Sequence, residues 1–176
     1  MVTPARFQIR PYRRGDERGV IEAVKAVYDE YGFEWDPAGY HADLYDVPGH
    51  YAQGAFLVAE SDGGIVGTAA LHLFDRLPDD ADVVEVGGFR RAGGADCAIE
   101  RLYVPKAHRR RGIGKALTLG IIRLAREADR RRMEIWSDKR FVEAHLLYRG
   151  LGARLVGERL CHDPEQSPEW GFALDL

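Results

Sequence analysis

The sequence lacks several features that would have set its class at once. No apolar run approaches the roughly 20 residues that a membrane-spanning helix needs, so we expect no membrane partner and a cytoplasmic location. Cysteine is scarce, because Cys97 and Cys161 stand alone, which argues against a disulfide framework or a cysteine metal site. Internal repeats and low-complexity segments are missing as well. We therefore expect two reduced thiols and no bound metal.

Basic residues are missing from one long stretch of the chain. Between Lys25 and Arg76 there is no lysine or arginine, whereas nine acidic residues fall there. From Arg101 to Arg132 the sign reverses, with eleven basic residues against two acids. One part of the sequence thus suits a cation and another part suits an anion.

The remaining composition is that of an ordinary soluble globular protein. The 176 residues are 45% hydrophobic and 30% charged, with a formal net charge of −3. A chain of this length can bury a core as one domain, so we expect a single domain over residues 1–176. The weak net charge and the acidic first half argue against nucleic-acid binding, which favours a basic surface interleaved with aromatic residues.

Hydrophobic periodicity predicts a mixture of strands and helices. In the first half we expect a strand at 7–10, a helix after Asp16, a short helix at about 37–44, paired strands at 55–60 and 65–73, and a possible strand at 83–90. In the second half we expect a strand at 97–104, a helix from 113 to about 128, a strand at 133–136, a helix at 140–149, and strands at 153–161 and 170–174. This order is typical of a mixed α/β sandwich.

Two of the expected helices carry finer predictions. Asp16 stands where its side chain would cap the first helix. The helix near residue 113 has apolar residues at steps of three and four, which predicts one buried face, made of Ile113, Leu117, Ile121, Leu124 and Ala128.

The most informative stretch is Arg109 to Lys115, which reads Arg-Arg-Arg-Gly-Ile-Gly-Lys between an expected strand and an expected helix. The first turn of a helix has unpartnered backbone N–H groups and partial positive charge, so it can hold an anion. Gly112 and Gly114 have no Cβ to keep a phosphate away, and the basic side chains add charge-assisted donors. A P-loop and a three-glycine dinucleotide fingerprint are both excluded, the latter because Leu117 stands at the third glycine position.

Two motifs together carry a family resemblance. Arg109-x-x-Gly112-x-Gly114, after the strand end at 102–105, resembles the acyl-CoA pyrophosphate-binding motif of the GNAT superfamily of N-acyltransferases. Downstream, Ala144 precedes Tyr148 by four residues and glycines follow at 150 and 152, as that family expects. The resemblance covers about residues 99–174, with both motifs in the family's order.

The resemblance implies a fold and a reaction. The fold would be α/β (α+β), a mixed, mostly antiparallel central sheet flanked by helices, in the order β-α-α-β-β-β-α-β-α-β-β. The reaction would be acetyl transfer from acetyl-CoA (coenzyme A) to a primary amine of a small-molecule acceptor, with a homodimer as one assembly. The alternatives are a catalytically silent acyl-CoA-binding domain and an acetyltransferase for protein amino groups.

The resemblance also implies which residues would hold the cofactor. Main-chain groups at the end of the strand would bind the pantetheine arm, and the glycine turn would bind the pyrophosphate. Phe141 departs from the family, which often has asparagine there, so we expect the lost side-chain contact at Arg140. Gly152-Ala153 replaces a usual Gly-Phe. The expected acetyl-CoA-binding residues are Leu102, Tyr103, Val104, Arg109, Arg110, Arg111, Gly112, Ile113, Gly114, Lys115 and Arg140.

Tyr148 matches the family tyrosine that protonates the departing CoA thiolate. A phenol titrates near 10 and a thiol near 8.5 in model compounds, so a positioned tyrosine hydroxyl can donate or share this proton. The alternative is that Tyr148 only packs in the core, on the helix face that carries Ala144.

Glu100 is the leading candidate for the base that removes a proton from the amine. It lies two residues before the expected pantetheine-binding end of the strand, where burial would raise its pKa. The alternatives are an ion pair between Glu100 and a neighbouring arginine, a water chain as the route for the proton, and His72 as the base. His72 is also expected among the residues that line the acceptor side.

The region 28–51 interleaves aromatic rings with acids and has no basic residue. Carboxylates and ring faces both attract cations, so we expect a cationic acceptor there. The expected substrate-binding residues are Tyr31, Glu34, Trp35 and His72. The alternative is that these rings pack beneath a loop.

Overall fold

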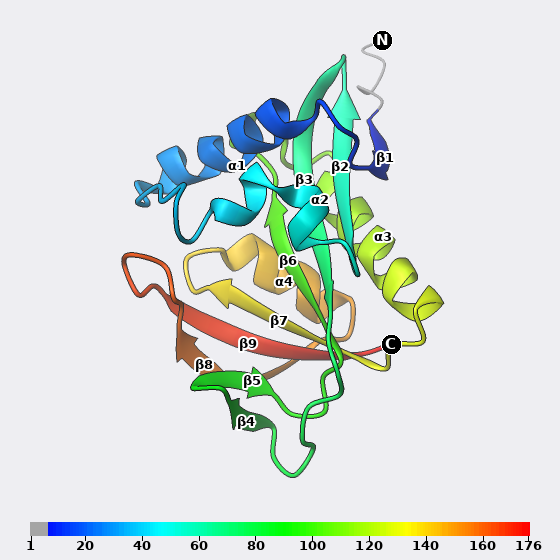
Figure 1. The fold of residues 1–176 in the computed structure, drawn as a ribbon, viewed down its shortest axis with the longest axis vertical. Helices are drawn as coiled ribbons and strands as arrows, with labels where there is room; N and C mark the ends of the chain where they lie inside the picture. The colour runs from blue at the N-terminus through cyan, green and yellow to red at the C-terminus, as the bar shows by residue number, and fades with distance from the viewer. Residues whose placement is uncertain (1–6) are drawn as a thin grey trace. The chain divides into compact units, whose positions relative to one another are not determined.

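The computed structural model describes residues 7–176 and contains nine strands and four α-helices within that range (Figure 1). The strands are β1 Gln8–Pro11, β2 Ala55–Ser61, β3 Gly64–Leu73, β4 Val83–Val86, β5 Phe89–Ala92, β6 Cys97–Tyr103, β7 Arg132–Asp138, β8 Arg154–Leu160 and β9 Pro168–Asp175. The helices are α1 Glu17–Tyr31, α2 Val47–His50, α3 Ile113–Glu127 and α4 Val142–Gly150, with 3₁₀ turns η1 Ala42–Tyr45 and η2 Lys106–His108.

The chain divides into two compact units, and each is built from separate stretches of sequence. Unit 1 holds the chain up to Ala70 and Arg101–Ile121, and unit 2 holds Leu71–Glu100 and Ile122–Leu176. The strands β3 and β6 and the helix α3 contribute residues to both units. The expected single domain over residues 1–176 stays a prediction.

Seven strands follow one hydrogen-bonded order, β1-β2-β3-β6-β7-β9-β8, while β4 and β5 pair only with each other. The pairs β1–β2, β7–β9 and β8–β9 are antiparallel. The pair β6–β7 is parallel, and its register, Cys97 with Met133 and Ala98 with Glu134, lies at the N-terminal ends of both strands. This confirms the expected fold class, a mixed α/β fold with a mostly antiparallel sheet and helices.

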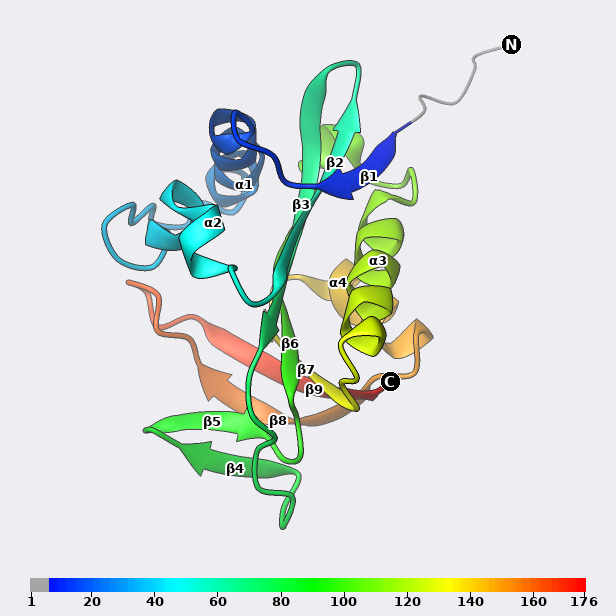
Figure 2. The same ribbon diagram turned by 45° about the vertical axis from the view of Figure 1, so that its right-hand side comes forward.

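In unit 1, α1 and the first half of α3 lie on opposite faces of strands β1–β3 (Figure 2). Alternate residues of β2 explain this, because successive strand side chains point to opposite faces. Phe56 and Val58 belong to the core cluster that contains the buried face of α1. Leu57 lies within 2.8 Å of a Cβ built on Gly120 in α3, so it faces the other helix.

Local details of the helices α1 and α3 differ from two sequence predictions. Asp16 precedes α1 but makes no side-chain capping bond, because its carboxylate accepts hydrogen bonds from Arg10 at 2.7 and 2.9 Å instead. On α3, Leu124 and Ala128 are only half-buried. Ile122 and Ala125 take their places in the core, because a 3.6-residue period moves the buried stripe around the helix.

The helix expected at about 37–44 is wrong. That stretch begins with a turn in which the Asp36 carboxylate accepts the N–H groups of Gly39 and Tyr40, both at 2.9 Å. The 3₁₀ turn η1 and the short helix α2 follow later, at 42–45 and 47–50. A short polar side chain that bonds its own backbone competes with helix formation, which explains the shift.

The possible strand at 83–90 is a hairpin of two strands, β4 and β5, so the expected order of elements is incomplete. Gly87 and Gly88 have φ values of 60° and 81°, the left-handed pair that a tight two-residue hairpin turn needs. The hairpin lies over the sheet of unit 2, because Val83 is 2.8 Å from a Cβ built on Gly157 in β8.

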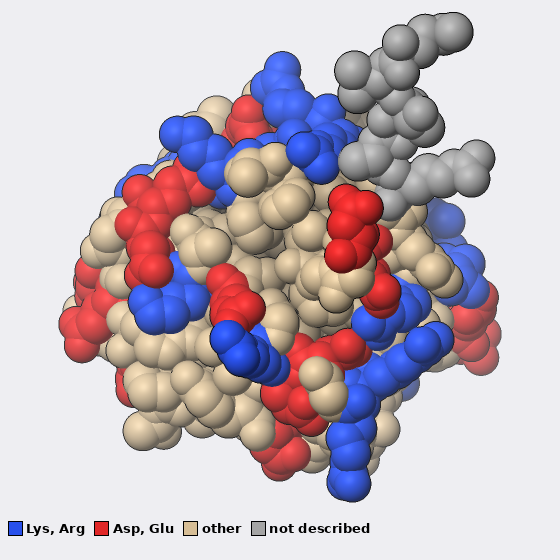
Figure 3. Space-filling view, turned by 90° about the horizontal axis from the view of Figure 1, so that it is seen from above, with Lys and Arg blue, Asp and Glu red and all other residues tan. Residues whose placement is uncertain are grey.

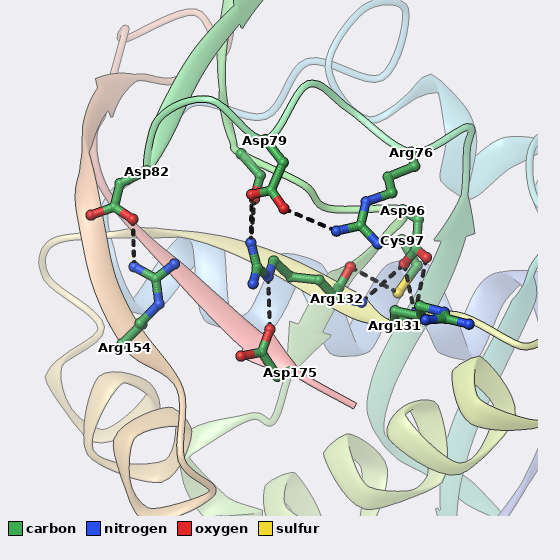
Figure 4. A network of polar contacts seen from close by, with 10 residues as sticks. Arg76, Asp79, Asp82, Asp96, Cys97, Arg131, Arg132, Arg154 and Asp175 are labelled. Carbon is green, nitrogen blue, oxygen red and sulfur yellow. Dashed lines mark hydrogen bonds and ion pairs between the residues drawn. The ribbon is translucent and has the colours of Figure 1, made fainter.

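Arginines and aspartates anchor the base of this hairpin (Figure 4). Arg132 donates to Asp79 at 2.9 Å, to Asp175 at 2.7 Å and to the Gly93 carbonyl at 3.0 Å. Asp96 accepts the backbone N–H groups of Arg131 and Arg132. The network therefore ties the segment before β6 to the start of β7 and to the end of β9.

Candidate functional site

The glycine turn of unit 1 is shaped as an anion site. Arg110 and Gly112 adopt left-handed φ values of 63° and 82°, and Ala116 N–H donates to Gly112 O at 2.9 Å as the first bond of α3. The N–H groups of residues 113–115 precede that bond, so the helix itself does not use them. A Cβ built on Gly112 meets no atom within 4 Å. Open space therefore lies beside the positive end of α3, as a bound phosphate requires.

Arg109 has a structural role in this turn. Its two terminal nitrogens donate to the Glu30 carboxylate at 2.8 and 2.7 Å, and its Nε donates to Val104 O at 2.9 Å. The guanidinium charge is thus already paired with a residue of α1. The expected phosphate contact of Arg109 stays a prediction, and Arg110, Arg111 and Lys115 are the exposed basic residues of the turn.

The end of β6 carries an irregularity that the sequence did not reveal. Arg101 has a φ of 53° inside the strand, and its carbonyl accepts the Thr68 hydroxyl at 2.7 Å. A left-handed residue in a strand re-aims the chain that follows it. The residues that follow are Leu102, Tyr103 and Val104, the half-buried end expected to bind pantetheine.

The Arg101 side chain holds part of the region 28–51 in place through Tyr40 and Asp43. It donates to both carboxylate oxygens of the buried Asp43, at 2.8 and 2.7 Å, and to Tyr40 O at 2.5 Å. Its guanidinium also lies 4.6 Å from the centre of the Tyr40 ring. Sequence reasoning missed this pair because its members are 58 residues apart.

The expected acceptor residues form part of a packed aromatic cluster. Trp35 stacks on His41, with ring centres 3.9 Å apart, and its Nε1 donates to Tyr45 at 3.3 Å. Tyr31 stacks on Phe33 at 5.4 Å. The alternative of packing beneath a loop therefore describes Trp35 well. Glu34 is exposed.

Most acids of this segment already have a local partner. Asp29 pairs with Lys25, Glu30 with Arg109 and Asp43 with Arg101. Asp36 and Asp46 accept backbone N–H groups of their own turns. The negative charge that suggested a cationic acceptor is thus largely used within unit 1.

His41 lies at the centre of the aromatic cluster and is fully buried. Burial lowers its pKa to about 4, and the nearby Arg101 charge acts in the same direction. Its Nδ1 accepts the Asp36 N–H at 3.1 Å. The ring is therefore neutral at pH 7 and serves the packing of unit 1.

In unit 2 the structure brings both candidate bases together. His72 Nδ1 lies 3.2 Å from Glu100 Oε1, on strands β3 and β6. The Glu100 side chain is 42% exposed, so the burial that was expected around it is not found. The hydrogen bond that Glu100 accepts from His72 raises the pKa of His72, while partial burial opposes that shift.

The ion pair of Arg91 and Glu134 lies near these two residues. Ala98 pairs with Glu134 in the β6–β7 register, so Glu134 and Glu100 project from the same face of the sheet. The buried Glu134 accepts Arg91 Nε at 2.6 Å and Ala92 N–H at 2.8 Å. Arg91 also covers the Phe74 ring at 4.5 Å, which places the β4–β5 hairpin at the candidate bases. Sequence reasoning missed this hairpin contribution.

Tyr148 is buried in α4, and its ring meets the Phe172 ring edge-on at 5.8 Å. His145, one turn earlier, lies 3.2 Å from the Ser137 hydroxyl. Burial lowers the pKa of His145, which fits a structural role. The acid role of Tyr148 stays a prediction.

Arg140 is held by an acidic neighbour. Its Nε and Nη2 donate to the two Asp138 carboxylate oxygens at 2.9 and 2.7 Å, and Ser167 Oγ lies 3.2 Å away. Phe141 occupies the N-cap position of α4. The expected cofactor contact of Arg140 stays a prediction.

Residues 7–176 contain neither a membrane-spanning helix nor a metal-binding cluster. No helix among them is long and apolar enough to cross a membrane. In the same range no group of three or more His, Cys, Asp or Glu residues is arranged to hold a metal ion.

Comparison with known proteins gives one family. The model of the acetyltransferase (GNAT) family matches residues 21–153. No curated protein sequence matches the chain.

Solved structures with the same fold include three acetyltransferases. A GNAT-family acetyltransferase from Staphylococcus aureus Mu50 is 21% identical, with a TM-score of 0.72, and the match covers 97% of this chain and 99% of that one. An acetyltransferase structure from Salmonella typhimurium, determined with its cofactor acetyl-CoA, is 18% identical, with a TM-score of 0.68 and coverages of 97% and 94%. A ribosomal-protein-alanine N-acetyltransferase from Brucella melitensis is 20% identical, with a TM-score of 0.68 and coverages of 96% and 99%.

Proposed function

The chain belongs to the acetyltransferase (GNAT) family, and from this premise we propose that it transfers an acetyl group from acetyl-CoA to a primary amine by direct attack of the amine nitrogen. The observation that carries the proposal is the glycine turn of unit 1. Its main-chain donors lie in the first turn of α3, and the space that a Gly112 Cβ would fill is open. A pyrophosphate fits that site by shape and by charge.

The residues of unit 1 would hold the cofactor. The N–H groups at the start of α3 would bind the pyrophosphate, and the main chain of Leu102–Val104 would bind the pantetheine arm. When bound there, acetyl-CoA supplies an acetyl group activated as a thioester. Arg109, paired with Glu30, would keep the turn in shape for this binding.

The residues of unit 2 would move the protons. An amine near pKa 10 arrives protonated and must lose a proton before it can attack. The Glu100–His72 pair would take that proton, and Tyr148 would protonate the departing thiolate. The structural alternative for Tyr148, packing against Phe172, is compatible with this role, because packing fixes the ring that carries the hydroxyl.

For the acceptor we propose a small amine with net positive charge. The support is the exposed Glu34 carboxylate, in a segment that also carries Tyr31 and Trp35, since carboxylates and aromatic rings both attract cations. Acids that are already paired, such as Asp43 and Glu30, lend no support. An acceptor of the protein type is the runner-up, because the Brucella structure with the same fold carries that activity in its name.

A thiol-release assay with acetyl-CoA and a panel of amines tests the proposal. The panel holds a polyamine, an aminoglycoside, an arylalkylamine, glutamate, aspartate and a peptide that begins with alanine. We expect turnover with the cationic amines and little with the acidic amino acids. Absence of turnover with every amine would favour a silent acyl-CoA-binding domain, and preference for the peptide would favour the runner-up.

Substitution of Glu34 tests the acceptor side separately. We expect Glu34→Gln to raise KM for a cationic amine with little effect on kcat, because the lost attraction acts equally in the ground and transition states. Glu22→Gln, which removes an exposed acid of α1, is the matched control. Equal KM values in the two variants would remove Glu34 from the acceptor site.

A further inference from the structure

We propose that His72 accepts the proton of the amine and that Glu100 is a positioning residue that holds the imidazole. This assignment rests on the proposed acetyl transfer and reverses the roles that the sequence suggested. It follows from the pairing of the two side chains across β3 and β6, with 3.2 Å between His72 Nδ1 and Glu100 Oε1.

The ring nitrogen of His72 that faces Glu100 determines which of the two residues acts as the base. A carboxylate beside Nδ1 favours the tautomer in which Nδ1 carries the proton and donates it to the carboxylate. The Nε2 lone pair is then the basic site of the neutral ring. Both side chains are reachable from solvent, with 54% of His72 and 42% of Glu100 exposed. The arrangement is thus an oriented base with an open approach.

The surrounding charges support His72 over Glu100. The charged groups that act on His72 are Glu100 on β6, Arg91 on β5 and Glu134 on β7. Arg91 and Glu134 are bonded to each other and shift the pKa of the ring in opposite directions, whereas the hydrogen bond with Glu100 has the largest effect. Glu100 remains as the decisive partner and raises the pKa of His72 above 6.5. An imidazole in that range is a stronger base than a carboxylate, whose ordinary pKa is near 4.3.

A purely structural pair is the competing explanation. Ion pairs that are this exposed add little to folding stability. The surrounding residues are already fixed by the buried Glu134 and its bonds to Arg91 and Ala92. Folding therefore gives no strong reason for a histidine and a glutamate to meet at this point of the sheet.

The proposed step balances. One N–H bond of the ammonium group breaks, and its proton passes to His72 Nε2. The freed nitrogen lone pair forms the C–N bond of the amide as the C–S bond of the thioester breaks, and the second proton leaves the nitrogen to water. The thiolate takes a proton from Tyr148, and the proton on water then restores the Tyr148 hydroxyl. The products are the amide, the free thiol of coenzyme A and one released proton, which His72 passes to solvent.

The test combines kinetics with histidine titration in three variants. We expect His72→Gln to lower kcat about 100-fold, the low end of general-base effects, with an unchanged KM for acetyl-CoA. We expect Glu100→Gln to keep more activity and to shift the acid limb of the kcat/KM profile to lower pH. His162→Gln, which changes an exposed histidine after β8, should leave rate and profile unchanged. Circular dichroism establishes that each variant is folded.

An NMR titration of the histidine rings gives a readout that does not need turnover. The His72 resonance is identified by its loss in His72→Gln, and its pKa should fall toward 6.5 in Glu100→Gln. A His72→Gln enzyme with wild-type kcat and an unchanged acid limb would overturn the proposal. An unchanged His72 titration in Glu100→Gln would overturn it as well, even if no amine in the panel proves to be a substrate.

Discussion

Single residues decide the chemistry of this protein through their partners. Tyr148 is buried against Phe172, His72 is bonded to Glu100, and His41 is buried within rings. Three side chains that can all exchange protons are thereby held in different surroundings. Glu100 raises the pKa of the half-exposed His72, whereas burial lowers the pKa of His41 to about 4 and keeps that ring neutral at pH 7. Environment, more than residue type, separates a reactive group from a structural one.

At this scale we predict that Tyr148→Phe lowers kcat by about 10- to 100-fold, because the ring stays and the donated proton is lost. The KM for acetyl-CoA should hardly change, since the proposed pyrophosphate site lies at the glycine turn and does not include Tyr148. Steady-state thiol release measures both values. Val142→Ala, at an exposed position of α4, is the control. Wild-type kcat in the phenylalanine variant would show that another group protonates the thiolate.

At the scale of elements, the turn before α3 and the β4–β5 hairpin carry the glycines with left-handed backbone that bear on the proposed site. The turn places a glycine with a φ of 82° beside open space at the start of a helix. The hairpin brings Arg91 to Glu134, next to the candidate bases. Both elements depend on glycines with left-handed backbone, which other residues adopt only at a cost. That similarity provides a matched experiment.

We predict that Gly112→Ala raises the dissociation constant of acetyl-CoA by at least about tenfold, because the new methyl group fills the space needed by the pyrophosphate. Gly88→Ala is the control, since Gly88 has nearly the same φ, 81°, and equally open surroundings. Both variants should lose similar stability from backbone strain. Calorimetry measures the affinity, and equal affinities in the two variants would exclude the turn as the cofactor site.

At the scale of the whole molecule, the segregated charges of the sequence meet in pairs. Glu30 and Asp43 from the acidic stretch bind Arg109 and Arg101 from the basic stretch. On the face drawn in Figure 3, side chains of both signs lie intermixed. Charge blocks in the sequence therefore do not produce a single-signed surface on that face, and the expectation that the protein does not bind nucleic acid stays a prediction.

Global stability should depend on pH through His41. Its pKa is about 4 in the folded chain and near 6.5 in an unfolded one, so the unfolded state binds more protons between these values. Stability is then complete above pH 6.5 and is lost as the pH falls toward 4, by roughly 3 kcal/mol. We predict a shallower loss in His41→Phe, which keeps an aromatic ring against Trp35.

Urea unfolding at several pH values between 7 and 4 measures this dependence. The comparison of His41→Phe with the wild type isolates His41, because shifts at other groups, such as the lowered pKa of His145, are common to both proteins. Equal slopes in the two proteins would show that His41 is not buried in its neutral form.

The sequence alone determined the types of most elements and the position of the glycine turn. Period, alternation and glycine placement act over a few residues, so they can be recognised without a structure. They located β2, β3, β6, α3 and α4 to within a few residues, and the family followed from two short motifs. They failed where side chains bond their own backbone, as at Asp36, and where two short strands merge into one pattern, as at 83–92.

Only the tertiary structure decided which charged and titratable groups meet. Arg101 and Asp43 are 58 residues apart, and His72 and Glu100 are 28 apart, so no local pattern links them. Sheet register and burial set these pairs. Most acids of the region 28–51 have partners within the fold, so they do not support a cationic acceptor. The fold also brings the two candidates for the base, His72 and Glu100, into contact. Contact between neighbouring strands depends on how the strands pair, and the sequence of either strand alone does not reveal it.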